Sequence, residues 1–67
     1  MEMMPINSRT MLTVGYESGS KKMKIKFRQG ESHTFCQVPQ NVFDAFLAAA
    51  SKDHFYEIHI KTMYQWY

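Results

Sequence analysis

Cationic side chains recur at every second position from Lys22 to Arg28, and this spacing favours anion binding. Lys22, Lys24, Lys26 and Arg28 alternate with apolar residues. In a β-strand such cations share one face and stand about 6.6 Å apart, a separation comparable with that of phosphates along a nucleic-acid strand. We therefore expect RNA or another polyanion to bind Lys22, Lys24, Lys26 and Arg28, with Lys21 and Arg9 as accessory contacts.

A second interpretation of the same row involves no ligand. Lysines keep an exposed sheet face soluble and discourage pairing between sheet edges. The row also lacks the interleaved aromatic residues on which single-strand binders stack bases. The alternation alone leaves both interpretations open.

Histidine and cysteine do not form a recognised catalytic or metal-binding pattern. The three histidines, His33, His54 and His59, lack the spacing of a zinc site, and Cys36 is the single cysteine. Nothing in the sequence supplies a base and an acid to activate the Cys36 thiol. We expect no catalytic residue, no metal and no cofactor, and the protein is predicted not to be an enzyme.

The last residues form a second candidate surface because they are rich in aromatic side chains. Trp and Tyr are frequent anchors of protein interfaces, so Tyr64, Trp66 and Tyr67 are candidate protein-interaction residues. The other interpretation is that this tail folds back onto the body of the domain, which would spare an exposed apolar patch. A protein partner, or a weak homodimer in place of a monomer, follows from the first interpretation.

Length and composition indicate one small domain. The 67 residues are 45% hydrophobic and 15% aromatic, with net charge +2, and a chain of this size has a correspondingly small core. The first 30 residues hold six of the eight Lys and Arg residues but only two of the six Asp and Glu residues. We expect a cytoplasmic protein, because the lone cysteine suits a reducing compartment and neither a membrane span nor a signal peptide is evident.

A β-hairpin must position the lysine row. Gly30 follows the alternating run, and a loop of Arg28-Gln29-Gly30 with Gly30 in the left-handed region suits these residues. That loop pairs Phe27 with Glu31, Ile25 with His33 and Met23 with Phe35. A two-residue turn would shift the register by one and place His33 and Phe35 beside the lysines.

The remaining elements complete an α+β fold. Residues 1–10 are predicted to be a lead-in and 11–17 a first strand, in which Leu12 shares a face with Val14 and Tyr16. Asn41 is the predicted N-cap of a helix that ends at Ala50 or Ser51, with Asp44 in its first turn. A second helix is expected over 54–63, with a strand over 57–60 as the alternative, and residues 63–67 form the tail. The predicted order is β-β-β-α-α: a three-stranded antiparallel meander with two helices packed on one face.

The residues together resemble the KTSC domain family, from about Ile6 onward. The resemblance rests on Val14-Gly15-Tyr16, Met23-x-Ile25-x-Phe27, Gly30, Phe35, Val38-Pro39, Val42, Phe46-Leu47, Ala50-x-x-x-x-Phe55-Tyr56 and Ile60. The family's Tyr-x-Tyr falls on His33-Thr34-Phe35, its common Gly on Asp53 and its Asn on Glu57. Any ligand contacts that the family makes through those groups would be altered here.

The resemblance implies a small bacterial or phage domain without established catalytic activity. RNA binding is implied only by the link of this family to the C-terminal extension of some lysyl-tRNA synthetases. We therefore expect a non-catalytic binding module that takes RNA or another polyanion. The alternative is a protein-interaction module, such as a phage-encoded inhibitor or adaptor that acts on a host protein.

Overall fold

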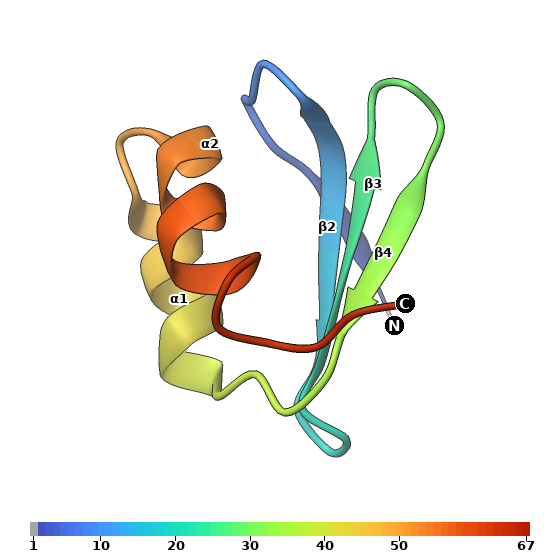
Figure 1. Ribbon diagram of the computed structural model, residues 1–67, viewed down its shortest axis with the longest axis vertical. Coiled ribbons are helices and arrows are strands. Elements are labelled where there is room, and N and C mark those ends of the chain that lie inside the picture. The colour runs from blue at the N-terminus through green and yellow to red at the C-terminus, as the bar shows by residue number, and fades with distance from the viewer. Residues whose placement is uncertain (1) are drawn as a thin grey trace.

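The computed structural model describes residues 2–67 and has two layers. Four antiparallel strands form one sheet in the order β1-β2-β3-β4: β1 (Met3–Pro5), β2 (Met11–Glu17), β3 (Lys22–Phe27) and β4 (Ser32–Phe35). The helical segments are α1 (Gln40–Ala48), α2 (Lys52–Phe55) and the π-helical η1 (Tyr56–Ile60). Figure 1 shows the helices on one side of the sheet only. The predicted α+β fold is confirmed, with one strand more than expected.

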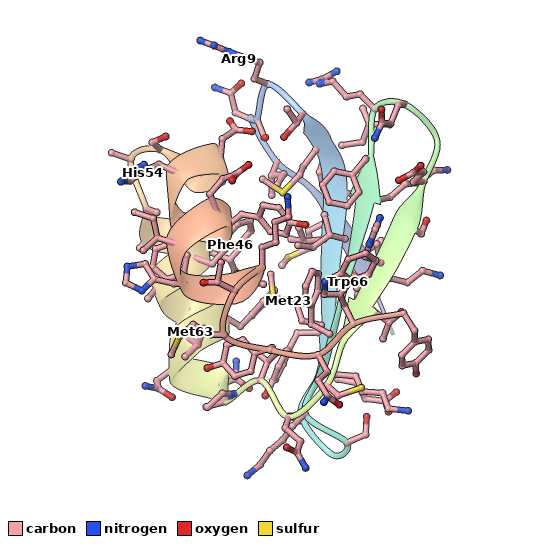
Figure 2. The ribbon with its side chains drawn as sticks, in the orientation of Figure 1. Arg9, Met23, Phe46, His54, Met63 and Trp66 are labelled. Carbon is pink, nitrogen blue, oxygen red and sulfur yellow. The ribbon has the colours of Figure 1, made fainter. Side chains whose placement is uncertain are left out.

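The alternation of β3 explains how the two layers meet. Met23, Ile25 and Phe27 are buried against the helical layer, whereas Lys24 and Lys26 are exposed. Figure 2 shows Met23 and Phe46 between the sheet and the helices. Both residues belong to the core, whose members are Met11, Val14, Met23, Ile25, Phe27, Phe35, Val38, Phe43, Phe46, Tyr56 and Ile60.

The hairpin register is the predicted one. Met23 pairs with Phe35 and Ile25 with His33, and the Phe27 N–H donates to the Glu31 carbonyl at 2.8 Å. Gly30 closes the loop with φ of 104°, a conformation that a Cβ atom resists. The three-residue loop is confirmed and the two-residue turn was wrong.

β1 lies in the predicted lead-in, and β2 contains an irregularity. Met3 to Pro5 pair with Gly15 to Thr13 of β2, which a run of three residues ending in proline did not suggest. The β2–β3 register shifts between Met11 and Thr13, so that Leu12 is an extra residue, a β-bulge. The bulge allows Met11 and Val14 both to be buried. The predicted shared face of Leu12 and Val14 was therefore wrong.

The first helix begins and ends earlier than predicted. Pro39 is the N-cap, and its carbonyl accepts from the Val42 and Phe43 N–H groups at 3.1 and 3.3 Å. Asn41 therefore lies inside α1 and caps nothing, and Asp44 lies beyond the first turn. Proline suits this boundary because it has no N–H to leave unpaired there. Ala49, with ψ of 138°, ends the helix before Ala50.

The second helix starts two residues earlier than predicted and widens midway. Ser51 caps α2 by accepting from the His54 N–H. The Lys61 N–H donates to the Tyr56 carbonyl five residues back, which is the π pattern, and Tyr56 and Ile60 both reach the core. Met63 lies beyond η1 and is exposed, and the alternative strand over 57–60 was wrong. Within residues 2–67 no helix has the length and apolar run needed to cross a membrane.

Asp53 joins the second helix to the loop between β1 and β2. Its carboxylate accepts from the Thr10 hydroxyl at 2.6 Å and the Ser8 hydroxyl at 2.9 Å, and from the backbone N–H groups of Arg9 and Thr10. These donors, the Thr10 hydroxyl first, hold the pKa of Asp53 at about 2, against the smaller opposing effect of burial. These hydrogen bonds, which we call the Asp53 clamp, connect residues more than 40 positions apart in the sequence.

We predict that Gly30→Ala lowers the free energy of unfolding by about 1–2 kcal/mol, because an L-residue must then adopt the left-handed conformation. Nothing lies within 4 Å of a Cβ at this position, so the destabilisation comes from the backbone conformation and not from contacts with neighbouring residues. Gly19→Ala is the matched control, since its Cβ also meets nothing and its φ is not in the left-handed region. Equal urea-denaturation midpoints for the two variants would refute this account of the loop.

We predict that Asp53→Ala lowers the free energy of unfolding at neutral pH by about 1–2 kcal/mol, because charge-assisted hydrogen bonds are lost. A carboxyl whose pKa is lowered by folding stabilises the folded protein at pH values above its unfolded pKa. This stabilisation is lost as the pH falls through the folded pKa. The difference between wild type and variant should therefore shrink from about pH 4 towards about pH 2. Thermal unfolding at several pH values measures it.

Asp44→Ala is the control for this series. Asp44 is exposed on α1 and accepts one hydrogen bond, from the Gln40 amide at 3.2 Å. Its removal should change stability little at any pH. A constant Asp53→Ala effect from pH 7 to about pH 2 would contradict the clamp.

Candidate nucleic-acid interface

The sheet face opposite the helices carries the lysine row. Lys24 lies between Gly15 of β2 and Thr34 of β4, and Lys26 lies between Thr13 and Ser32. We call this surface the outer face. Because antiparallel partners directly opposite each other point to the same side, each of these two lysines stands beside small or hydroxyl-bearing neighbours.

A groove crosses the outer face. It has a volume of about 590 Å³ and runs from β1 to β4; its lining residues are Met3, Pro5, Leu12, Thr13, Lys24, Lys26 and Ser32. Two ammonium groups and two hydroxyls line it together with apolar side chains. This combination can bind an anionic chain and leave room for less polar parts of the same ligand.

Lys24 and Lys26, at the centre of the outer face, carry charge that no carboxylate opposite them neutralises. Among residues 2–67, the one basic side chain within 4 Å of a carboxylate is His33, whose Nε2 lies 3.3 Å from Glu31 Oε2. Lys22 lies opposite Glu17 in the register, so a carboxylate stands beside this lysine. Lys24 and Lys26 have no carboxylate opposite them on either side. The centre of the outer face is therefore electropositive.

The structure does not bring all the predicted cations together. Lys21 lies in the turn before β3, with φ of 55°, and Arg9 lies in the loop between β1 and β2, at the opposite end of the sheet (Figures 1 and 2). Arg28 follows β3 and its Nε donates to the Ser8 carbonyl at 3.0 Å, so it holds the same loop as Asp53. Lys22, Lys24 and Lys26 are the members that share the outer face.

The aromatic tail is divided between two surfaces. Tyr64 is half-buried against the core. Trp66 pairs with Phe35, and its ring lies 4.2 Å from that of His33. Tyr67 is 68% exposed. The predicted trio therefore does not form one continuous patch.

Trp66 and His33 border a cavity of about 310 Å³ on the helical side. Tyr56, Glu57 and Lys61 line it as well. Burial, with a smaller contribution from Glu57, raises the pKa of Tyr56. His33 and Glu57 are the positions at which the resemblance places a family Tyr and Asn, so these two positions share one cavity. Its charges have mixed signs, which favours neither anions nor cations.

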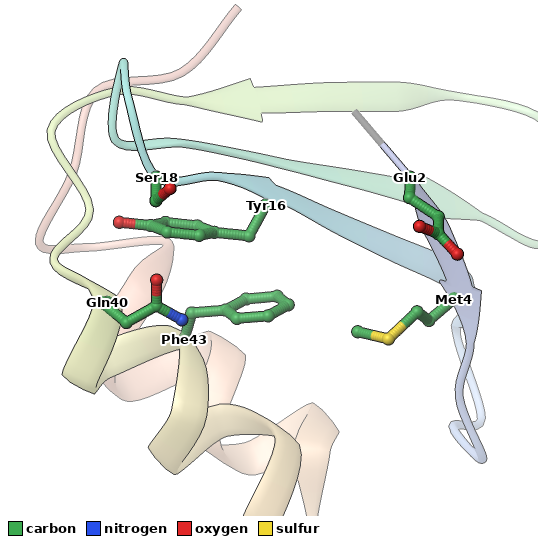
Figure 3. A pocket seen from close by; sticks show the side chains of 6 residues that line it. All are labelled: Glu2, Met4, Tyr16, Ser18, Gln40 and Phe43. Atoms are coloured by element: carbon green, nitrogen blue, oxygen red, sulfur yellow. The ribbon is translucent and has the colours of Figure 1, made fainter.

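A further cavity, of about 300 Å³, opens between β1 and α1. Figure 3 shows the ring of Tyr16 over that of Phe43, with Met4 at the side and Glu2, Ser18 and Gln40 around them. The two ring centroids are 4.9 Å apart and nearly parallel. The Tyr16 hydroxyl donates to the Val38 carbonyl. The stack is thus built into the packing of α1 on the sheet.

Two histidines and the cysteine lie outside the groove of the outer face. The His59 ring lies 4.7 Å from that of Phe55 and is tilted against it by 40°, and His54 is exposed on α2. Cys36 is half-buried at the end of β4. Within residues 2–67 no group of three or more His, Cys, Asp or Glu is placed to hold a metal ion.

Fold and surface together define a small α+β domain with an uncovered, basic sheet face. The KTSC domain model matches residues 7–64, and the chain belongs to the KTSC domain family. A crystal structure of a KTSC domain protein from Yersinia pestis superposes with a TM-score of 0.95 at 26% identity, covering 98% of this chain and 93% of that one. A curated relative from Tsukamurella paurometabola is 32% identical over 53 residues, 79% of each chain.

We predict that the emission of Trp66, the single tryptophan, is blue-shifted from that of free tryptophan and does not change on dilution. Its ring is 45% exposed and rests on His33 and Phe35 of the same chain. Fluorescence spectra over a concentration series provide the measurement. Emission that shifts to the red on dilution would mean that the tail docks on a second copy instead.

Proposed function

We propose that this KTSC domain is a non-catalytic module that binds RNA or another polyanion through its outer face. The observation that carries the proposal is that Lys22, Lys24 and Lys26 stand in a row on the face that the helices leave open. Phosphate contacts from lysine and hydroxyl groups position a nucleic acid without reading its sequence. The ligand is therefore defined by its charged backbone.

The neighbours of the lysines support the same proposal. Thr13, Thr34 and Ser32 lie directly opposite Lys26 or Lys24 in the ladder and offer hydroxyl donors. Gly15 lies opposite Lys24 and has no side chain to block a backbone that crosses the sheet.

The alternative, a protein-interaction module acting as an inhibitor or adaptor of a host protein, rests on the aromatic tail. Trp66 retains 45% exposure and Tyr67 68%, but the two side chains belong to different surfaces. Charge and hydroxyl groups gather on one continuous face, which is why we place polyanion binding first. The unpaired Cys36 suits the reducing cytoplasm as the site of action.

We predict that Lys24→Glu combined with Lys26→Glu abolishes binding of a short fluorescein-labelled RNA in an anisotropy titration. Both side chains are exposed, so the far-UV circular dichroism spectrum should remain unchanged. For the wild type, log K should fall with log salt with a slope of about −2, as expected for three phosphates neutralised on a single strand.

Lys52→Glu combined with Lys61→Glu is the matched control, because it changes the net charge equally on the helical side. This variant should retain most of the wild-type affinity. Equal losses in the two double variants would show that net charge, and not the outer face, determines binding. Unchanged binding in the Lys24/Lys26 variant would exclude the outer face as the site.

A further inference from the structure

The end of the chain extends the sheet beyond β4. The Thr34 N–H donates to the Tyr67 carbonyl at 2.9 Å, and the Tyr67 N–H donates to the Thr34 carbonyl at 3.1 Å. The Cys36 N–H donates to the Gln65 carbonyl at 3.0 Å, and Phe35 forms an antiparallel bridge with Trp66. Residues 65–67 therefore lie beside β4 as an additional edge of the sheet.

This pairing places Trp66 and Tyr67 on opposite faces. Trp66 lies opposite Phe35, which is fully buried, and its ring contacts His33 and Phe35 on the helical side. Successive side chains of an extended segment point to opposite faces. Tyr67 must therefore lie on the outer face, beside its partner Thr34.

The ladder then sets Tyr67 in line with the lysine row. Tyr67 lies opposite Thr34, Thr34 opposite Lys24, and Lys24 opposite Gly15. Two strand spacings separate Tyr67 from Lys24, about 10 Å. Between them stands only the small side chain of Thr34. One nucleotide can span such a gap, with its phosphate at Lys24 and its base at Tyr67.

Tyr67 is more exposed than core packing would explain. Its side chain is 68% exposed, whereas its backbone is held by two hydrogen bonds to Thr34. The backbone of Tyr67 is thus held beside Thr34, and its ring is open to a ligand. Exposed aromatic rings beside cations are the platforms on which single-strand binders stack bases. Tyr67 thus supplies the aromatic ring that the lysine row itself does not contain.

We propose that the ligand of the outer face is single-stranded nucleic acid, with one base stacked on the Tyr67 ring while Lys24 and Lys26 hold the backbone. The inference rests on the proposed function and specifies its ligand. Bases within a duplex are already stacked on one another and cannot lie on a protein ring. The outer face should therefore bind a single strand more tightly than a duplex of equal length at the same salt concentration.

The test compares Tyr67→Ala with Tyr67→Phe. Four labelled probes are titrated: a single-stranded RNA, a DNA of the same sequence, the corresponding duplex, and a single strand of equal length without bases. Tyr67→Ala should weaken binding of the base-bearing single strands about tenfold. It should leave the affinity for the base-free strand unchanged. Tyr67→Phe should retain most of the wild-type affinity, because the ring remains.

Two measurements keep the outcomes separate. Trp66 emission should be the same in Tyr67→Ala as in the wild type, which shows that the tail is still paired with β4. An equal loss of affinity for the base-free strand, or no loss for any probe, would overturn the stacking proposal. If Lys24→Glu with Lys26→Glu still abolishes binding in that case, the proposed polyanion function stands. Failure of the wild type to bind any probe would overturn both.

Comparison of the RNA and DNA arms tests whether the sugar contributes to recognition. Similar affinities support recognition by stacking and backbone charge, as proposed. A duplex that binds as tightly as the single strands would contradict the proposal, because no base would then be free to reach Tyr67.

Discussion

The antiparallel pairing of β3 with its two neighbours is the constraint on which the rest of the structure depends. Met23 and Ile25 are completely buried between the layers, and the lysines between and beside them face outward. A slip of one residue would turn Lys24 and Lys26 into the core, where unpaired charges cost far more than so small a domain can supply. Gly30 and the Phe27–Glu31 hydrogen bond maintain the register at the loop. The same pairing therefore creates both the core and the basic face.

The elements with a regular pattern were predictable from the sequence, and those that depend on distant partners were not. Strict alternation predicted β3, and the glycine predicted the loop and its register. β1 has three residues and acquires its strand conformation by pairing with β2, so no local pattern marks it. The clamp of Asp53 on Ser8 and Thr10 likewise depends on tertiary contacts. The bulge places Leu12 on the face opposite to Val14, whereas simple alternation predicts that the two residues share a face.

The candidate site was predictable in its charges but not in its extent. Lys22, Lys24 and Lys26 follow from period two, whereas Arg28 is turned away to the Ser8 carbonyl. Tyr67 was predicted to be a protein-interaction residue, but its place on the lysine face follows from the pairing of residues 34 and 67, which no pattern within the tail reveals. With one face covered by helices and the other open, a domain of this size leaves half of its sheet available for a ligand.

The most direct test of the account is an NMR titration of the labelled protein with a short single-stranded RNA, following the backbone amides. If the outer face binds the strand, the largest shift changes should lie on Lys24, Lys26, Thr34 and Tyr67, and α1 should be unaffected. Changes concentrated around Tyr16 and Phe43, at the cavity between β1 and α1, would contradict the outer face as the binding surface.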